Sequence, residues 1–253
     1  MSDFDRNYAA ATRGVGADRA VIDAGLRAYM IRIYNYMAMG VALTGVVAWI
    51  TFQAAVVTNA AGTITGLTPF GQMIFSGPAV LVLFLGTLGL VVLISWRIDR
   101  LQPATALTLF MVYAGVLGLM LSSIFLAYTG ASITRVFFIS AASFGALSLY
   151  GYTTQRDLSP MGAFLIMGLI GLLIAMLVNI FLKSSGLDFV ISAVGVLIFA
   201  GLTAWDTQKI KEMYDPMEDG TVVGRKAVMG ALTLYLDFIN LFLFLLRLFG
   251  DRR

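Results

Sequence analysis

The longest uncharged stretch of the chain constrains its fold more than any other feature. No Asp, Glu, Lys or Arg occurs from Ile33 to Trp96. A membrane-spanning helix needs only about 20 apolar residues, so a single helix cannot account for this stretch. Glycine, proline and asparagine gather between Gln53 and Ser76, which predicts a break in the middle. We therefore expect two spans here, near Tyr29–Phe52 and Gly77–Trp96.

The rest of the chain repeats this pattern of apolar segments separated by charged ones. Hydrophobic residues make up 59% of the chain and charged residues 12%, whereas soluble domains contain about 25% charged residues. This composition excludes a soluble enzyme, and it also excludes a disordered chain. The sequence predicts an all-α polytopic membrane protein with seven transmembrane helices. The other five are expected near Ala104–Ala127, Val136–Thr153, Met161–Leu182, Leu187–Asp206 and Ala227–Phe249.

The chain contains neither cysteine nor histidine. Disulfides, thiolate or imidazole metal sites, and catalysis by these side chains are therefore excluded. The formal net charge is only +3 and the basic residues are scattered, which argues against nucleic acid binding. We expect no enzymatic activity, no nucleic acid partner and no tightly bound cofactor.

The first 27 residues differ from the rest because they are polar and of mixed charge, without the apolar segment of a signal peptide. Arg19, Asp23 and Arg27 are spaced so that they share one face of a helix. We expect residues 1–27 to form a cytoplasmic tail with a short amphipathic helix at the membrane surface, followed by a transmembrane domain of residues 28–253. A frayed, solvated tail is the alternative.

The basic residues are distributed unevenly along the chain. Most of them lie in the N-terminal tail and in the segments that follow the second, fourth and sixth spans. Because cytoplasmic segments carry the excess of Lys and Arg, the N-terminus is expected in the cytoplasm. Seven spans then place the C-terminus outside. Arg252 and Arg253 at the C-terminus favour the alternative of a re-entrant last helix.

Two carboxylates are candidates for a functional site. Asp206 closes the sixth span, and Asp237 lies inside the seventh with apolar residues on both sides. An ionised Asp at the centre of a span costs about 2.5–3.5 kcal/mol, so such a residue is a functional candidate by default. Two carboxylates in contact in an apolar environment would share a proton, which makes a pH sensor without histidine. Asp206 taken alone is equally well explained as an interfacial residue beside Lys209.

Three further residues are candidates for supporting this pair. Arg97 and Arg100 lie at the inner end of the second span, where either could latch a singly charged carboxylate pair. The alternative for both is an interfacial anchor that extends toward the lipid headgroups. Asn240 follows Asp237 on the same helical face and is a candidate hydrogen-bond partner for its carboxyl group.

Two segments carry a resemblance to a known family. Residues 204–211 (AWDTQKIK) and 231–242 (ALTLYLDFINLF) resemble the signature of the Bax inhibitor-1 family, in particular its bacterial branch. Residues 32–40 (RIYNYMAMG) and 118–124 (GLMLSSI) support the resemblance. It implies a multi-pass protein of the bacterial inner membrane, in which six helices wrap a central seventh.

The resemblance also implies a function, a pH-sensitive calcium leak gated by a di-aspartyl pair. Asp206 and Asp237 match the two aspartates of the family, and Arg100, or alternatively Arg97, matches its latch arginine. The implied partners are protons, the lipid bilayer and calcium ions, the last bound only weakly because Asp206 and Asp237 offer few oxygens. Some bacterial relatives resemble regulators of a membrane-bound AAA protease, so such a regulator without transport is the alternative function.

Overall fold

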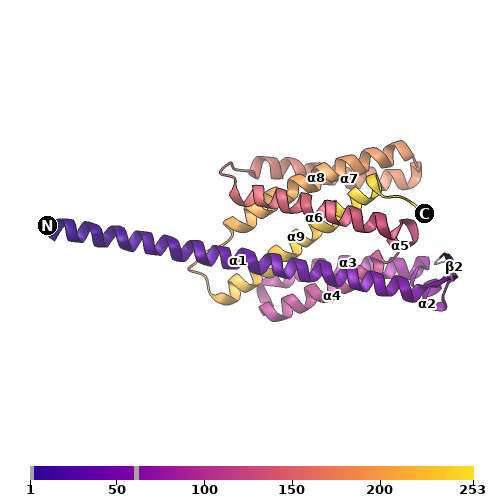
Figure 1. The fold of residues 1–253 in the computed structure, drawn as a ribbon, viewed down its shortest axis with the longest axis horizontal. Helices are drawn as coiled ribbons and strands as arrows, with labels where there is room; N and C mark the ends of the chain where they lie inside the picture. The colour runs from indigo at the N-terminus through magenta and orange to yellow at the C-terminus, as the bar shows by residue number, and fades with distance from the viewer. Residues whose placement is uncertain (1–2, 60–62) are drawn as a thin grey trace.

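The computed structural model describes the backbone of residues 3–59 and 63–253, and side chains from residue 22 onward within those ranges. The chain is helical apart from one short antiparallel hairpin (Figure 1). The elements follow one another as α1 (Asp3–Ala55), β1 (Val56–Thr58), β2 (Ile64–Leu67), α2 (Pro69–Ile74), α3 (Gly77–Arg97), the 3-10 turn η1 (Ile98–Arg100), α4 (Pro103–Leu121), α5 (Ile124–Ala127), α6 (Gly130–Thr153), α7 (Ser159–Leu182), α8 (Ser185–Glu212) and α9 (Gly220–Phe249).

Seven segments in the described part of the chain are long and apolar enough to cross a membrane, which confirms the expected fold class. The spans agree with those predicted, but three helices extend beyond their predicted ends. α6 begins at Gly130 instead of near Val136, α8 continues to Glu212, and α9 begins at Gly220. The predicted ends were placed at charged residues, whereas a helix at the membrane surface continues through such residues when its side chains reach water or polar partners.

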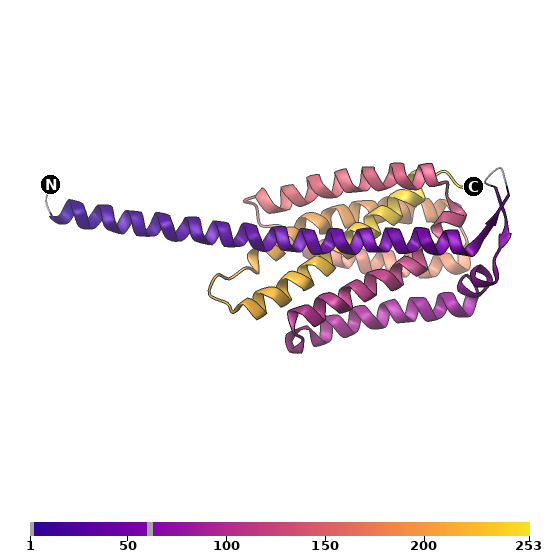
Figure 2. The ribbon, with the colours of Figure 1, turned by 60° about the horizontal axis from the view of Figure 1, so that its bottom comes forward.

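The first helix is longer than a membrane span. α1 is continuous from Asp3 to Ala55, and its N-terminal part projects from the bundle (Figures 1 and 2). The segment that qualifies as a span begins at Ile22. Asp23 and Arg27 are exposed, whereas the side chain of Arg19 lies outside the described residues. A location of this segment along the membrane surface stays a prediction.

The last helix forms the centre of the bundle, as expected. In its most apolar stretch 72% of the residues are buried, compared with 11% in α3 and in α7. α1, α4, α6 and α8 pack directly against α9. α3 packs mainly on α4 and α7 mainly on α8, so these two helices form an outer layer that faces lipid. A buried position on α9 is therefore surrounded by protein, even in a membrane.

The two ends of the bundle differ. The hairpin, α5 and the C-terminus lie at one end, and the α6–α7 and α8–α9 connections lie at the other (Figure 1). The start of α9 at the latter end is fixed by polar contacts. Asp219 caps the helix, and hydrogen bonds from Thr221 hold the pKa of the Asp219 carboxyl group below its usual value. Arg225 Nε donates to the carbonyl oxygen of Leu101 at 2.6 Å. This extra length of α9 carries its N-terminal turns beyond the predicted membrane boundary.

Candidate di-aspartyl site

The site begins with an unusually close approach between α6 and α8. A Cβ atom placed on Gly151 of α6 would lie 2.1 Å from the carbonyl oxygen of Ala204 on α8. Only glycine permits this distance between two helix backbones, and small residues are the usual means of such contact in membranes. Ala204 immediately precedes Trp205 and Asp206 in α8, so this contact fixes the depth and rotation of the first aspartate.

α8 and α9 bring the two aspartates together. Asp206 is 8% exposed and Asp237 is 5% exposed. Their carboxyl groups are close enough to interact with each other. An ionised carboxylate can only accept hydrogen bonds, so a hydrogen bond between the two groups requires that one of them carries a proton. The structure therefore brings the two residues together as a pair of neighbouring carboxyl groups on two helices.

One atom of the pair is left without a partner. Oδ2 of Asp237 is buried and makes no hydrogen bond within the described part of the chain. A buried polar atom without a partner is costly, and such atoms in native structures often mark a site for an ion, a proton or water. This carboxylate oxygen is thus a candidate acceptor for a proton or a cation.

Lys209 lies near the pair, and its charge attracts the carboxylate of Asp206. Its ammonium group lies 5.0 Å from the centre of the Trp205 ring, and its side chain is exposed. Arg97 and Arg100 are also exposed, and among the described residues neither forms an ion pair with Asp206 or Asp237. The latch contact is absent from this conformation, and the latch role of Arg100 or Arg97 stays a prediction.

Asn240 hydrogen-bonds within its own helix. Its Nδ2 donates to the carbonyl oxygen of Leu236 at 2.8 Å. A hydrogen bond from Asn240 to the carboxyl group of Asp237 stays a prediction. A short polar side chain in a helix can reach the backbone carbonyl one turn earlier, and in an apolar environment this local bond satisfies it without a neighbouring helix.

A chain of hydroxyl groups beside the pair was not predicted. The hydroxyl groups of Tyr34 on α1 and Ser148 on α6 are hydrogen-bonded, and Ser148 Oγ lies 2.9 Å from Thr207 Oγ1. Thr207 directly follows Asp206. Tyr34 and Ser148 also line a groove of about 640 Å³ between α1 and α6, with Arg27 at its edge. The hydroxyl groups thus connect this groove to Thr207 on α8.

The end of α8 is tied to the α6–α7 connection. Gln208 Oε1 accepts from the backbone nitrogen of Leu158, and its Nε2 donates to the carbonyl oxygen of Arg156, both at 2.8 Å. Lys211 Nζ donates to the carbonyl oxygen of Tyr152 at 2.9 Å. Because these contacts hold α8 in the turns that directly follow Asp206, movement of α8 at the pair would have to involve the α6–α7 connection as well.

The side chains of the site offer few ligands for a metal ion. No group of three or more acidic, histidine or cysteine side chains suited to a metal ion occurs among the described residues. Calcium in a full protein cage takes six to eight oxygens, so two carboxyl groups would bind it weakly. The arrangement suits a cation that passes or binds transiently better than one that stays.

The sequence of this chain matches the family model described as "Inhibitor of apoptosis-promoting Bax1" over residues 26–253. The chain belongs to the Bax inhibitor-1 family. The match includes six of the seven candidate spans completely and the first from residue 26 onward, together with Asp206 and Asp237. It confirms the resemblance that the segments around these two aspartates indicated.

Relatives of this Bax inhibitor-1 protein cover nearly its whole length. An uncharacterized protein of Rickettsia prowazekii (strain Madrid E) is 49% identical over 231 residues, which are 91% of this chain and 92% of the relative. The inner membrane protein YbhL of Escherichia coli (strain K12) is 45% identical over 233 residues, which are 91% of this chain and 94% of the relative. An uncharacterized protein of Caulobacter vibrioides is 42% identical over 100% of both chains. The chain is thus a multi-pass membrane protein of the Bax inhibitor-1 family.

Proposed function

We propose that this protein is a pH-sensitive calcium leak of the bacterial inner membrane, gated by the Asp206–Asp237 pair. The observation that carries the proposal is the close approach of two buried carboxyl groups on neighbouring helices. Similarity to an inner membrane protein of Escherichia coli supports the location. The uneven distribution of basic residues supports an N-terminus in the cytoplasm.

The shared proton acts as the gate in this proposal. When the pair carries one proton, the carboxyl groups of Asp206 and Asp237 form a hydrogen bond that joins α8 to α9. Removing that proton breaks the bond, because two ionised groups repel each other, whereas adding a second proton leaves a weaker hydrogen bond between two neutral groups. A change of protonation therefore shifts the population between two packings of α8 against α9.

The carboxylate oxygens also attract the cation. Oδ2 of Asp237 has no hydrogen-bond partner among the described residues. A calcium ion that reaches this depth meets one or two negative charges and few neutral oxygens, so it is attracted but not retained. Weak binding favours conduction, because an ion must leave the site as readily as it enters.

Calcium uptake into proteoliposomes tests the proposal. Purified protein is reconstituted into vesicles loaded with a calcium indicator, and uptake is followed across a pH series between about pH 5 and pH 8. We expect uptake well above that of empty vesicles, with a rate that changes with pH along a single titration curve. Absence of uptake from folded, inserted protein would contradict the proposal and favour the regulator of a membrane-bound protease.

A further inference from the structure

A second cavity lies at the end of the bundle opposite to the α8–α9 connection. Its volume is about 790 Å³, and α7, α8 and α9 form most of its wall together with Phe84 of α3. Arg247, near the end of α9, and Arg252, in the C-terminal tail, both line it. Neither residue takes part in the di-aspartyl site, so this cavity calls for a separate explanation.

The polar groups of the cavity are mainly donors. Arg247 lies with its guanidinium 5.6 Å from the centre of the Phe244 ring and forms no ion pair with any described residue. Arg252 approaches the carboxylate of Asp188 at 3.9 Å, the limit for an ion pair. Two guanidinium groups and one carboxylate therefore line the cavity, which carries a net positive charge.

Asn179 adds a further donor to this wall. Its Oδ1 accepts a hydrogen bond from the backbone nitrogen of Ser184 at 3.0 Å. Its amide N–H groups have no partner within the described part of the chain, although the residue lines the cavity. Guanidinium and amide donors that converge on one space are suited to a phosphate group, which guanidinium binds through two parallel hydrogen bonds.

The remaining wall is apolar and opens toward the bilayer. Phe84, Leu177 and Ile180 line the cavity, and they are 50%, 60% and 63% exposed. On membrane-spanning helices such exposed apolar side chains face lipid. The cavity thus joins a positively charged head region to a surface that contacts acyl chains, which is the shape and polarity of a phospholipid.

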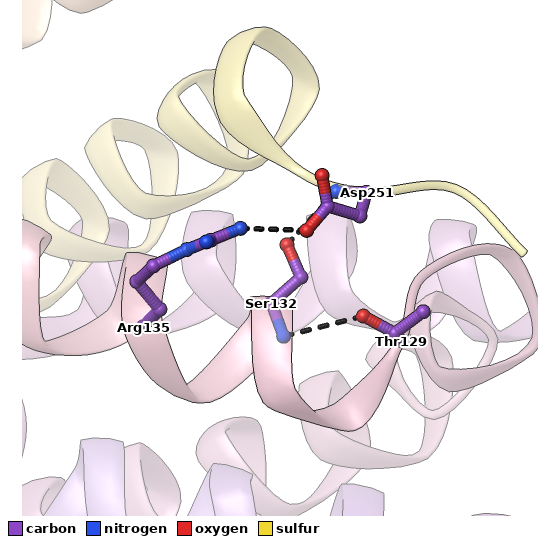
Figure 3. A network of polar contacts seen from close by, with 4 residues as sticks. All are labelled: Thr129, Ser132, Arg135 and Asp251. Carbon is purple, nitrogen blue, oxygen red and sulfur yellow. Dashed lines mark hydrogen bonds and ion pairs between the residues drawn. The ribbon is translucent and has the colours of Figure 1, made fainter.

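Asp251, the residue before Arg252, is held by contacts with the start of α6 (Figure 3). The Asp251 carboxylate pairs with Arg135 at 2.6 Å, and the Asp251 backbone nitrogen donates to Ser132 Oγ at 2.9 Å. The backbone nitrogen of Thr129 donates to the carbonyl oxygen of Asp251 at 3.1 Å. These contacts hold the tail against the start of α6. Because the tail is already held in place, little further conformational entropy is lost when Arg252 binds a ligand in the cavity.

We propose that this cavity is a binding site for one anionic glycerophospholipid. The phosphate lies between Arg247 and Arg252, with the amide of Asn179 as a further donor. One acyl chain lies along Phe84, Leu177 and Ile180. The net positive charge of the head region selects an anionic lipid over a zwitterionic one, even though Asp188 reduces that charge.

Native mass spectrometry of the purified, delipidated full chain in detergent tests the site. Phosphatidylglycerol, phosphatidylcholine and inorganic phosphate are titrated separately against the wild type and the variants Arg247→Gln and Arg252→Gln. We expect the wild type to bind one phosphatidylglycerol in preference to phosphatidylcholine. Each variant should weaken that binding at least about tenfold, because each loses a charge-assisted hydrogen bond. Lys183→Gln is the matched control, because Lys183 is exposed near the same end but does not line the cavity.

Three outcomes would overturn the proposal. Equal binding of phosphatidylglycerol and phosphatidylcholine would show that charge does not select the lipid. Binding of inorganic phosphate as tight as that of phosphatidylglycerol would indicate a site for a free anion. Unchanged binding in both arginine variants would place the lipid elsewhere. Arg252 is exposed in the tail, so Arg252→Gln should keep the fold even if Arg247→Gln does not.

Discussion

Replacing Asp237 with asparagine is expected to abolish the pH dependence of calcium uptake. Asparagine has nearly the shape of aspartate, and its amide can donate to the Asp206 carboxylate, so the contact between α8 and α9 is kept. The asparagine side chain does not gain or lose a proton at physiological pH, so a change of pH no longer alters the protonation of this residue. One of the two charges that attract calcium is also lost. A loss of about 1.4 kcal/mol of attraction would lower uptake about tenfold.

The control for this variant is Asp99→Asn. Asp99 is an exposed carboxylate on η1, and η1 packs against α9. Its replacement removes the same charge without touching the pair, so the pH profile of uptake should match that of the wild type. A wild-type pH midpoint in Asp237→Asn would mean that the pH sensor is some other group.

Replacing Gly151 with alanine is expected to destabilise the fold and displace Asp206. The new methyl carbon would lie 2.1 Å from the Ala204 carbonyl oxygen, so α6 and α8 must separate. Overpacking of this kind typically costs about 1–3 kcal/mol. The separation would also strain the hydrogen bond between Ser148 and Thr207, which joins the same two helices. We expect a lower Tm in detergent and an altered rate of calcium uptake.

Gly145→Ala on the same helix is the matched control. No atom of the described residues lies within 4 Å of a Cβ atom placed there. Alanine is the better helix former by about 1 kcal/mol, so this variant should be as stable as the wild type or more stable. Equal Tm values for the two variants would mean that the close approach at Gly151 does not limit the packing of α6 against α8.

The fold was largely predictable because charge is so scarce in this chain. A span is recognised from the absence of charges, and this criterion located all seven. It failed at helix ends, where charged side chains find partners within the protein. Arg135 pairs with Asp251 and so lies inside α6, and Lys211 bonds the Tyr152 carbonyl oxygen and so lies inside α8. These partners are distant in sequence, which is why the ends were misplaced.

The candidate site was predictable only in part. Asp206 and Asp237 stood out because acidic residues are rare in spans. Whether they could meet depended on how far α9 extends toward the cytoplasmic end of α8. In the structure α9 begins at Gly220 rather than near Ala227. Tyr34, Ser148 and Thr207 carry no comparable signal. Hydroxyl residues are common in spans and usually bond their own helix, so only the packing of α1, α6 and α8 identifies this chain of hydroxyl groups.

The measurement that tests the central claim most directly follows the proton and the ion together. Infrared difference spectroscopy of protein in proteoliposomes reports protonated carboxyl groups across a pH series, and calcium uptake is recorded on the same preparation. The account predicts a protonated-carboxyl signal that disappears in Asp237→Asn and whose pH midpoint in the wild type coincides with that of uptake. A change in uptake with pH without any accompanying change in this signal would contradict gating by the shared proton.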